Sequence, residues 1–278
     1  MATGVPAGSG ARPAAEASVP NPAARFVIKT FAIANMEVRK LRHDPTELVS
    51  RAIQPLLWLL VFGQVLGRLH SLPTGRLTYA EFLAPGILAQ SVLFVAIFYG
   101  ISVIWERDLG IVHKFLVTPT PRAALVLGKA VSAGVRALSQ AVIVYLASFA
   151  LGVRLNASPA ALLGVFVLIM MGAALFATFS LIIASLVKTR ERFMGIGQVL
   201  TMPLFFASNA IYPTSAMPDW LRAIARVNPL TYQVDGLRSL MLKDGVSSLG
   251  LGVDVLVLAS VLLLLILIGA RLYPRIVT

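Results

Sequence analysis

Charged residues are scarce in this chain of 278 residues, since Asp, Glu, Lys and Arg together make up only 13% of it. Hydrophobic residues make up 58%. Soluble domains carry about 25% charged residues and about 45–50% apolar ones. This deficit of charge excludes a water-soluble core, so lipid is the expected solvent for most of the chain.

Cysteine is absent and histidine is rare, with only His43, His70 and His113. These absences exclude a disulfide framework and thiolate metal sites, and they argue against a multi-histidine metal site. A phosphate-binding loop is also missing, because Gly128-Lys129-Ala130 lacks the Ser or Thr and the upstream glycine of that motif. We therefore expect no catalytic residue, metal or cofactor in this chain. A membrane enzyme is the least favoured class of function.

Long apolar stretches dominate the chain instead. Each supplies roughly the 17–25 residues that a helix needs to cross a hydrocarbon core of about 30 Å. A backbone in lipid must satisfy its own hydrogen bonds, and the alternating period of barrel strands is absent. The sequence predicts an all-α integral membrane fold with six transmembrane helices in a domain over residues 48–273. The six stretches cover residues 48–67, 82–105, 122–153, 159–187, 193–212 and 251–273.

The region before the first stretch divides into two parts. Residues 1–24 are rich in Ala, Pro, Gly and Ser, which is typical of a disordered leader. Residues 25–45 are predicted as an amphipathic connecting helix, because Val27, Phe31 and Ala34 fall on one face and basic residues elsewhere. Such a helix fits the membrane surface, and it equally fits packing against other protein.

The basic residues indicate an orientation. Of the 24 Lys and Arg residues, 17 lie in the segments on the side shared by both termini, and seven lie in the loops on the other side. Basic residues collect on the cytoplasmic side, so both termini are expected in the cytoplasm and the protein in the plasma (inner) membrane. The formal charge of +12 is explained by this topology, and nucleic acid is not an expected partner.

Inside the predicted spans, ionisable residues are nearly lacking, which disfavours a proton-coupled pump. A channel is disfavoured too, because no ring of charges or carbonyl-filter sequence is visible. Amide, aromatic and Met side chains of the second and fifth spans suit an amphipathic cargo, although any one of them could serve packing alone. The predicted pathway residues are Gln90, Phe94, Phe98, Gln198, Met202, Phe205, Phe206 and Asn209.

The segment 105–122 between the second and third spans has a charged start, an apolar middle and a stop at Pro119 and Pro121. These features fit either a short helix that docks into a groove of a partner or an ordinary connecting loop. Its sequence resembles the coupling region of type-2 ABC exporter permeases, E-R-[ED]-x-G-[ST]-x-[ED]-x-L-x-x-[ST]-P-x-x-R followed by L-G-K. The matching residues are Glu106, Arg107, Asp108, Gly110, Leu116, Thr118, Pro119, Arg122 and Leu127-Gly128-Lys129. Ile111 and His113 depart from the pattern, and they place one charge contact with a partner in question.

A second resemblance to this family follows the fifth span. The motifs that resemble the family's outer loop are Ser208-Asn209-Ala210-Ile211-Tyr212-Pro213, Met217-Pro218-Asp219-Trp220-Leu221, Asn228-Pro229-Leu230-Thr231-Tyr232 and Asp235-Gly236-Leu237-Arg238. The outer segment covers residues 213–242. Pro213 and Pro218 interrupt the helix, and two short amphipathic helices can follow. The segment is either a re-entrant outer cap, as the resemblance implies, or a surface loop with interfacial aromatic residues. The expected cap residues are Pro213, Pro218, Trp220, Asn228, Pro229, Tyr232 and Arg238.

The two resemblances, which together cover roughly residues 25–273, imply the permease subunit of an ATP-driven exporter of the family that includes daunorubicin-resistance permeases and polysaccharide exporters. Two permeases, identical or related, would pair in the bilayer with two cytosolic ABC ATPase subunits that hold ATP and Mg. A cytoplasmic coupling helix over residues 106–114 would contact the ATPase, and the implied contact residues are Glu106, Arg107, Asp108, Gly110, His113, Lys114, Thr118, Pro119 and Arg122. The expected cargo is drug-like or lipid-like. The alternatives are a polysaccharide or glycolipid cargo, and a membrane anchor that recruits a cytosolic partner without transport.

Overall fold

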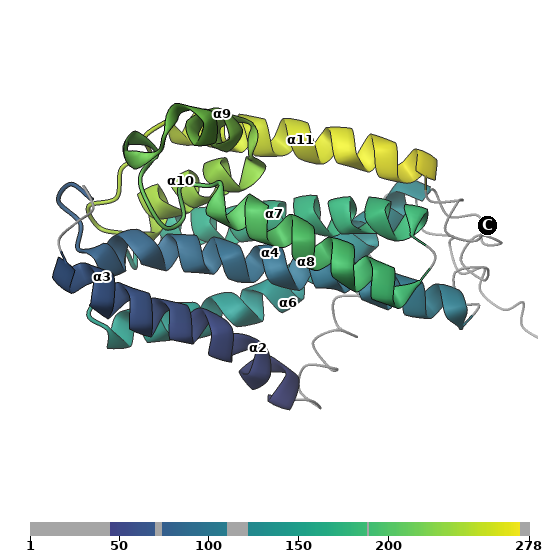
Figure 1. Cartoon of the computed structure of the whole chain (residues 1–278), viewed down its shortest axis with the longest axis horizontal. Coiled ribbons are helices and arrows are strands. Elements are labelled where there is room, and N and C mark those ends of the chain that lie inside the picture. Colours follow the sequence, from purple (N-terminus) through teal and green to yellow (C-terminus); the bar gives the residue numbers. More distant parts are fainter. Residues whose placement is uncertain (1–44, 70–73, 110–121, 188, 273–278) are drawn as a thin grey trace, which may run out of the picture.

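The computed structural model describes residues 45–69, 74–109, 122–187 and 189–272, and within these ranges the chain folds into a bundle of helices (Figure 1). The only strand-like pairing in these ranges is a single bridge between Leu155 and Leu242. The leader over residues 1–24 and nearly all of the predicted helix over residues 25–45 lie outside the described residues. The fold is therefore all-helical, as the sequence predicts.

The long helices lie roughly parallel to one another in Figure 1. They are α4 (Tyr79–Asp108), α6 (Arg122–Ala150), α7 (Pro159–Leu186), α8 (Arg190–Phe206) and α11 (Leu251–Leu272). The segment before α4 consists of α2 (Pro45–Leu57), a π-helical turn η1 (Trp58–Phe62) and α3 (Gly63–Leu69). Short helices η2 (Thr214–Ala216), α9 (Asp219–Val227) and α10 (Pro229–Met241) join α8 to α11 at one end of the bundle.

Helix α4 lies at the centre of the bundle. It packs against α7, α6, α10 and α8, and most of its apolar side chains are fully buried. Its central residues Ile87, Leu88, Val92 and Leu93 have no exposed surface, so this helix supplies much of the hydrophobic core.

Within the described ranges, four helical segments are long and apolar enough to cross a membrane: Tyr79–Ile101, Ala130–Ala150, Pro159–Leu186 and Leu251–Leu272. The last of these, in α11, packs against α7 and α10 but leaves large side chains such as Leu256 and Leu263 at least 60% exposed. A helix this apolar with so much exposed surface fits a lipid environment. The protein is thus an integral membrane protein.

Two of the predicted spans differ from the observed helices. The apolar helix in the first span, Ala52–Arg68, is shorter than the four long ones. Pro55 removes a helical hydrogen bond near its start, and the π-helical turn follows three residues later. The helix predicted over residues 193–212 begins earlier, at Arg190, and ends at Phe206, before Tyr212, because the chain turns at Ala207 after Pro203.

The turn after α8 is held against α4 by an unusually close backbone contact. A Cβ atom placed on Gly86 would lie 2.8 Å from the Cα atom of Ala210, and closer still to its carbonyl oxygen. Both partners in this contact are backbone, so neither can rotate away. Gly86 is therefore the residue that lets the turn over residues 207–212 approach the central helix.

We predict that Gly86→Ala lowers the free energy of unfolding by about 2–3 kcal/mol, the cost of overpacking a close contact. The matched control is Gly252→Ala on the exposed start of α11, where a Cβ meets nothing within 4 Å. Thermal unfolding in detergent, followed by circular dichroism, measures both variants. Equal unfolding midpoints for the two variants would contradict this role of Gly86.

Candidate functional site

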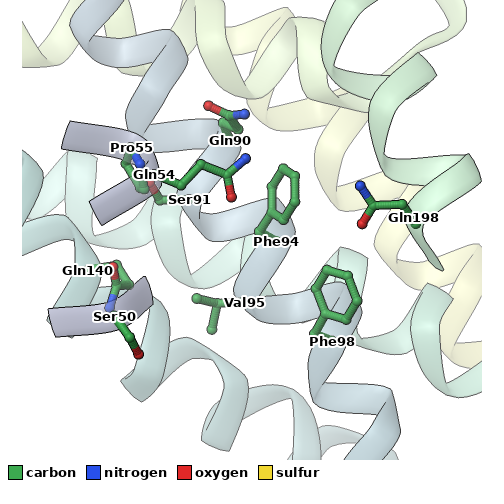
Figure 2. Close-up of a pocket in the computed structure, with 10 residues that line it drawn as sticks. All are labelled: Ser50, Gln54, Pro55, Gln90, Ser91, Phe94, Val95, Phe98, Gln140 and Gln198. Carbon is green, nitrogen blue, oxygen red and sulfur yellow. The ribbon is translucent and has the colours of Figure 1, made fainter. Parts of the chain in front are cut away.

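A cavity of about 350 Å³ lies between α2, α4, α6 and α8 (Figure 2). Its lining residues belong to four helices that are far apart in the sequence. They are Ser50, Gln54, Pro55, Gln90, Ser91, Phe94, Val95, Phe98, Gln140 and Gln198. The cavity is therefore formed only when the whole bundle is assembled.

Each of the four helices contributes one glutamine to this cavity: Gln54 from α2, Gln90 from α4, Gln140 from α6 and Gln198 from α8. Gln90 is buried, and neither its amide oxygen nor its amide nitrogen has a hydrogen-bond partner among the described residues. A buried amide without partners is costly and is usually satisfied by water or a ligand. The unsatisfied amide oxygen and nitrogen of Gln90 therefore indicate a bound polar group.

The apolar part of the cavity wall comes mainly from α4. Phe94 and Phe98 lie one helical turn apart, with ring centroids 6.1 Å apart and nearly parallel rings. Among the described residues that line the cavity, none carries an acidic or basic side chain. The cavity can therefore offer aromatic faces together with amide donors and acceptors, which suits an uncharged or amphipathic molecule.

The structure brings together half of the pathway residues predicted from the sequence. Gln90, Phe94, Phe98 and Gln198 line the cavity, while the other four do not. Phe205 is buried against Trp58, Phe206 is partly exposed, and Asn209 is buried in the turn after α8. Met202 lies on α8 and is partly exposed. All eight still stand as a prediction of the pathway.

Several lining residues were not predicted. None of them was expected to line a pathway: Ser50, Gln54, Pro55, Ser91, Val95 and Gln140. The available signal was that each of four spans carries a glutamine. The presence of a glutamine in a span does not show its depth in the membrane or the helix face on which it lies. The glutamines alone therefore could not identify the residues that line the cavity.

At the turn over residues 207–212, side chains supply hydrogen bonds to backbone carbonyls that lie outside a regular helix. Asn228 donates its side-chain amide to the carbonyls of Leu204 and Ala207, at 2.7 and 3.0 Å. The Tyr79 hydroxyl donates to the carbonyl of Ile211 at 3.1 Å, and the Tyr212 hydroxyl donates to that of Phe206. Side chains thus replace the helical hydrogen bonds that are lost where α8 ends.

Arg238 completes this set from α10. It is buried, and its guanidinium donates to the carbonyl of Asn209 at 2.8 Å and to that of Phe82 at 3.3 Å. The same group lies 3.9 Å from the centroid of the Phe82 ring. Burial lowers the pKa of Arg238 to about 10, while the nearby Asp235 opposes this shift, so the side chain stays charged at neutral pH. A single cation thereby joins α10, α4 and the turn after α8.

The other predicted cap residues lie in α9 and α10 or at their ends. Pro218 precedes α9, Asn228 accepts a hydrogen bond from the backbone of Leu230 at the start of α10, and Pro229 is the first residue of α10. The Tyr232 hydroxyl donates to the carbonyl of Arg226 at 2.6 Å. Pro213 lies just before η2, and Trp220 on α9 is 67% exposed. The segment is thus an ordered helical pair, with α10 packed against α4, α7 and α11.

An ion-pair network ties three segments together at the same end of the bundle. The buried Glu81 carboxylate accepts a hydrogen bond from Arg154 Nε at 2.8 Å, and Arg154 also pairs with Asp244 at 2.9 Å. The hydrogen bond and charge of Glu81, with the charge of Asp244, raise the pKa of Arg154. The backbone adds hydrogen bonds between residues 154–156 and 241–243. Helix α4 is thereby fixed to the loops that precede α7 and α11.

At the opposite end, only part of the predicted coupling segment is described. Asp108 ends α4, and its carboxylate pairs with Arg190 at 2.8 Å. The side chains of Glu106, Arg107 and Arg122 lie outside the described residues, as do Gly110, His113, Lys114, Thr118 and Pro119 entirely. The predicted contacts of this segment with an ATPase remain predictions.

A helical membrane protein with a polar, uncharged cavity between four of its helices has the architecture of a protein that carries or conducts a solute through the bilayer. A family model described as ABC-2 type transporter matches residues 29–242. The chain therefore belongs to the ABC-2 type transporter family, and the resemblance found in its sequence is confirmed.

Individual relatives agree with this assignment. The chain is 29% identical over 220 residues to a putative transport permease, ycf38, of Cyanophora paradoxa, which covers 77% of this chain and 74% of the relative. It is 25% identical over 201 residues to the daunorubicin resistance ABC transporter permease protein DrrB1 of Streptomyces coeruleorubidus, covering 72% and 70%. It is 32% identical over 174 residues to the probable multidrug ABC transporter permease YbhR of Escherichia coli K12, covering 61% and 46%.

We predict that Gln90→Leu raises the free energy of unfolding by about 1–2 kcal/mol, because it removes a buried amide without partners at nearly constant side-chain volume. Gln198→Leu is the matched control, because Gln198 lines the same cavity but is exposed. Its midpoint should change little. Thermal unfolding in detergent measures both. A lower midpoint for Gln90→Leu would show that its amide has a structural partner and is not kept for a ligand.

Proposed function

We propose that this chain is the membrane-spanning permease subunit of an ATP-driven ABC exporter. A separate ATPase subunit would supply the energy, and the cargo would be an amphipathic drug-like or lipid-like molecule. The observation that carries the proposal is the cavity with four glutamines and two stacked phenylalanines, in a chain of the ABC-2 type transporter family. Two relatives named for daunorubicin or multidrug permeases support a drug-like cargo.

The proposed topology has six spans. Four are the long apolar segments, the first is formed by α2, η1 and α3, and the fifth is α8. Because 17 of the 24 basic residues fall in the sequence segments on the side shared by both termini, both termini are assigned to the cytoplasm and the membrane to the plasma (inner) membrane. Helices α9 and α10 then form the re-entrant outer cap, and the side-chain hydrogen bonds to the carbonyls of the turn after α8 support this assignment.

The partners follow from the same proposal. Residues 105–122 would form the coupling segment and seat on a cytosolic ABC ATPase, which holds ATP and Mg. Two permeases, identical or related, would assemble with two ATPases. The amphipathic helix over residues 25–45 would lie on the cytoplasmic side, following a leader over residues 1–24. A polysaccharide or glycolipid cargo is the alternative within the same class, and a non-transporting anchor is the alternative outside it.

The mechanism rests on a change of helix arrangement that nucleotide favours. Binding of ATP would shift α4 and α8 from an arrangement that opens the cavity toward the cytoplasm to one that opens it outward. A nearly complete switch of this kind needs a difference of about 5.5 kcal/mol between the two arrangements. Rigid tilting of packed helices is the expected form of the movement, since packed interiors do not deform continuously.

The first test is purification of the full chain from native membranes in mild detergent, with an ATP hydrolysis assay on the eluate. We predict that an ABC ATPase is recovered with the wild-type chain in near-equal amount. Glu106→Ala with Arg107→Ala should lose most of it, because these residues lie in the proposed coupling segment. The control Asp219→Ala breaks an ion pair of α9 through its exposed partner at the other end of the bundle, and should retain the ATPase.

The recovered proteins decide between the candidate functions. An ATPase that is lost only in the coupling-segment variant supports the exporter. A well-folded wild-type chain that brings down no ATPase would contradict it, and the anchor would become the leading alternative. Sugar-transfer enzymes recovered together with the ATPase would favour the polysaccharide cargo.

A further inference from the structure

The two helices that flank the cavity on its aromatic side are joined by a polar contact at the end opposite α9 and α10. Arg190, the first residue of α8, donates from Nε and Nη2 to one carboxylate oxygen of Asp108, the last residue of α4, at 3.1 and 2.8 Å. The same guanidinium lies 3.6 Å from the centroid of the Trp105 ring. We call Trp105, Asp108 and Arg190 the α4–α8 clamp.

The clamp lies where the chain enters the proposed coupling segment. Residues 105–108 are the last turn of α4, and the chain continues from Asp108 into the segment that the proposed function places against the ATPase. That segment is joined to the bundle by the last turn of α4 at one end and by the first turn of α6 at the other, so a displacement of it acts directly on the last turn of α4. Arg190 of α8 contacts this last turn of α4 twice, through an ion pair with Asp108 and through a cation–π contact with the Trp105 ring.

Helix α8 depends on α4 for its position more than on any other long helix. Its described packing is chiefly against α4, with little against α7. Beside the clamp, Phe193 of α8 is fully buried with Ile104 of α4 and with Ile183 and Ala184 of α7. A Cβ placed on Gly100 of α4 would lie 2.7 Å from the Phe193 ring, so the two helices are in close contact here. The clamp therefore adds a directional link to a close apolar contact.

The clamp is too exposed to be explained by stability alone. The Arg190 and Asp108 side chains are 34% and 37% exposed, and exposed ion pairs contribute little to the stability of a fold. Two hydrogen bonds and a ring contact on a single guanidinium, however, fix its orientation as well as its distance. Such a contact is suited to holding two helix ends in register.

We infer that Trp105, Asp108 and Arg190 are positioning residues that transmit movement of the coupling segment to α8, and so to the cavity at Gln198. This inference rests on the proposed function. It changes the role expected of Asp108, because the carboxylate is directed at Arg190 of the same chain, whereas the resemblance implies a contact with the ATPase. In this role α4 and α8 move together at their clamped ends, and Gln198, two turns into α8, moves with them.

The test uses the absence of cysteine from the chain, because a single introduced thiol is then unique. The reporter is Gln198→Cys in the co-purified complex with the ATPase, labelled by a water-soluble maleimide with and without ATP and vanadate. With the clamp intact, we expect nucleotide to change the labelling rate about three- to tenfold. Arg190→Gln, which lies outside the proposed coupling segment, should remove most of this change while the amount of ATPase recovered and the basal ATP hydrolysis stay as in the reporter alone. Asp108→Asn should remove most of the change as well.

Two further variants separate transmission from a general loss of structure. The double variant Asp108→Asn with Arg190→Gln should behave like either single variant, because both remove the same pair. The charge reversal Asp108→Arg with Arg190→Asp should regain at least half of the nucleotide-dependent change. Asp219→Asn breaks the ion pair of α9 and leaves the Arg222 hydrogen bonds to Thr214 and Met217 in place, so it is the matched control and should leave the change intact.

Each outcome has one reading. If the double variant loses more of the nucleotide-dependent labelling change than either single variant, by the product of their two effects, Asp108 and Arg190 act separately. That result would overturn the proposed role of the clamp. Loss of the ATPase from Asp108→Asn would also overturn it, because Asp108 would then be a contact residue of the partner. Absence of the ATPase from the wild-type chain is a different result, and it contradicts the proposed function itself.

Discussion

The structure depends on a constraint of the bilayer, namely that no backbone polar group can lie in lipid without a hydrogen bond. Most of the chain meets it by forming helices, but α8 ends at Phe206 and the chain continues as an irregular turn. Asn228, Arg238, Tyr79 and Tyr212 supply donors to carbonyls of this turn from four places in the sequence. These side chains hold α8, α10 and the start of α4 in one fixed arrangement, and the cavity depends on it.

The two ends of the bundle differ in the polar contacts of their described residues. The α9–α10 end carries the buried Arg238 and the network of Glu81, Arg154 and Asp244. At the other end, the polar link described between α4 and α8 is the partly exposed pair of Asp108 and Arg190. The alternating access proposed for this chain would act on the cavity that lies between these two sets of contacts.

The sequence predicted the fold well and the site only in part. Apolar length alone located α4, α6, α7 and α11 to within a few residues, because a helix is the only local solution for such stretches in lipid. Apolar length did not predict where α8 ends. That end depends on Pro203 and on contacts with Asn228 and Gly86, which lie far away in the sequence. A match of local motifs identified the family, because those residues are close together in the chain.

The cavity could not be assigned from the sequence for the same reason. Gln54 and Gln140 are brought to Gln90 and Gln198 by the packing of four helices, and an amide in an apolar stretch more often serves helix contacts. The pairing of Asp108 with Arg190 was also out of reach, because it joins residues separated by two whole helices. Asp108 was assigned to a partner by resemblance, whereas its described contact is within the chain.

The central claim, that the cavity is the path of an ATP-driven permease, is tested most directly by blocking it. In inside-out vesicles that hold the chain and its ATPase, Gln198→Cys is labelled to completion with a bulky thiol reagent, and uptake of the fluorescent amphipathic drug daunorubicin is followed with and without ATP. The account predicts ATP-dependent uptake before labelling and its loss afterwards, with hydrolysis of ATP still present. Uptake that continues unchanged after complete labelling, or that never depends on ATP, would contradict it.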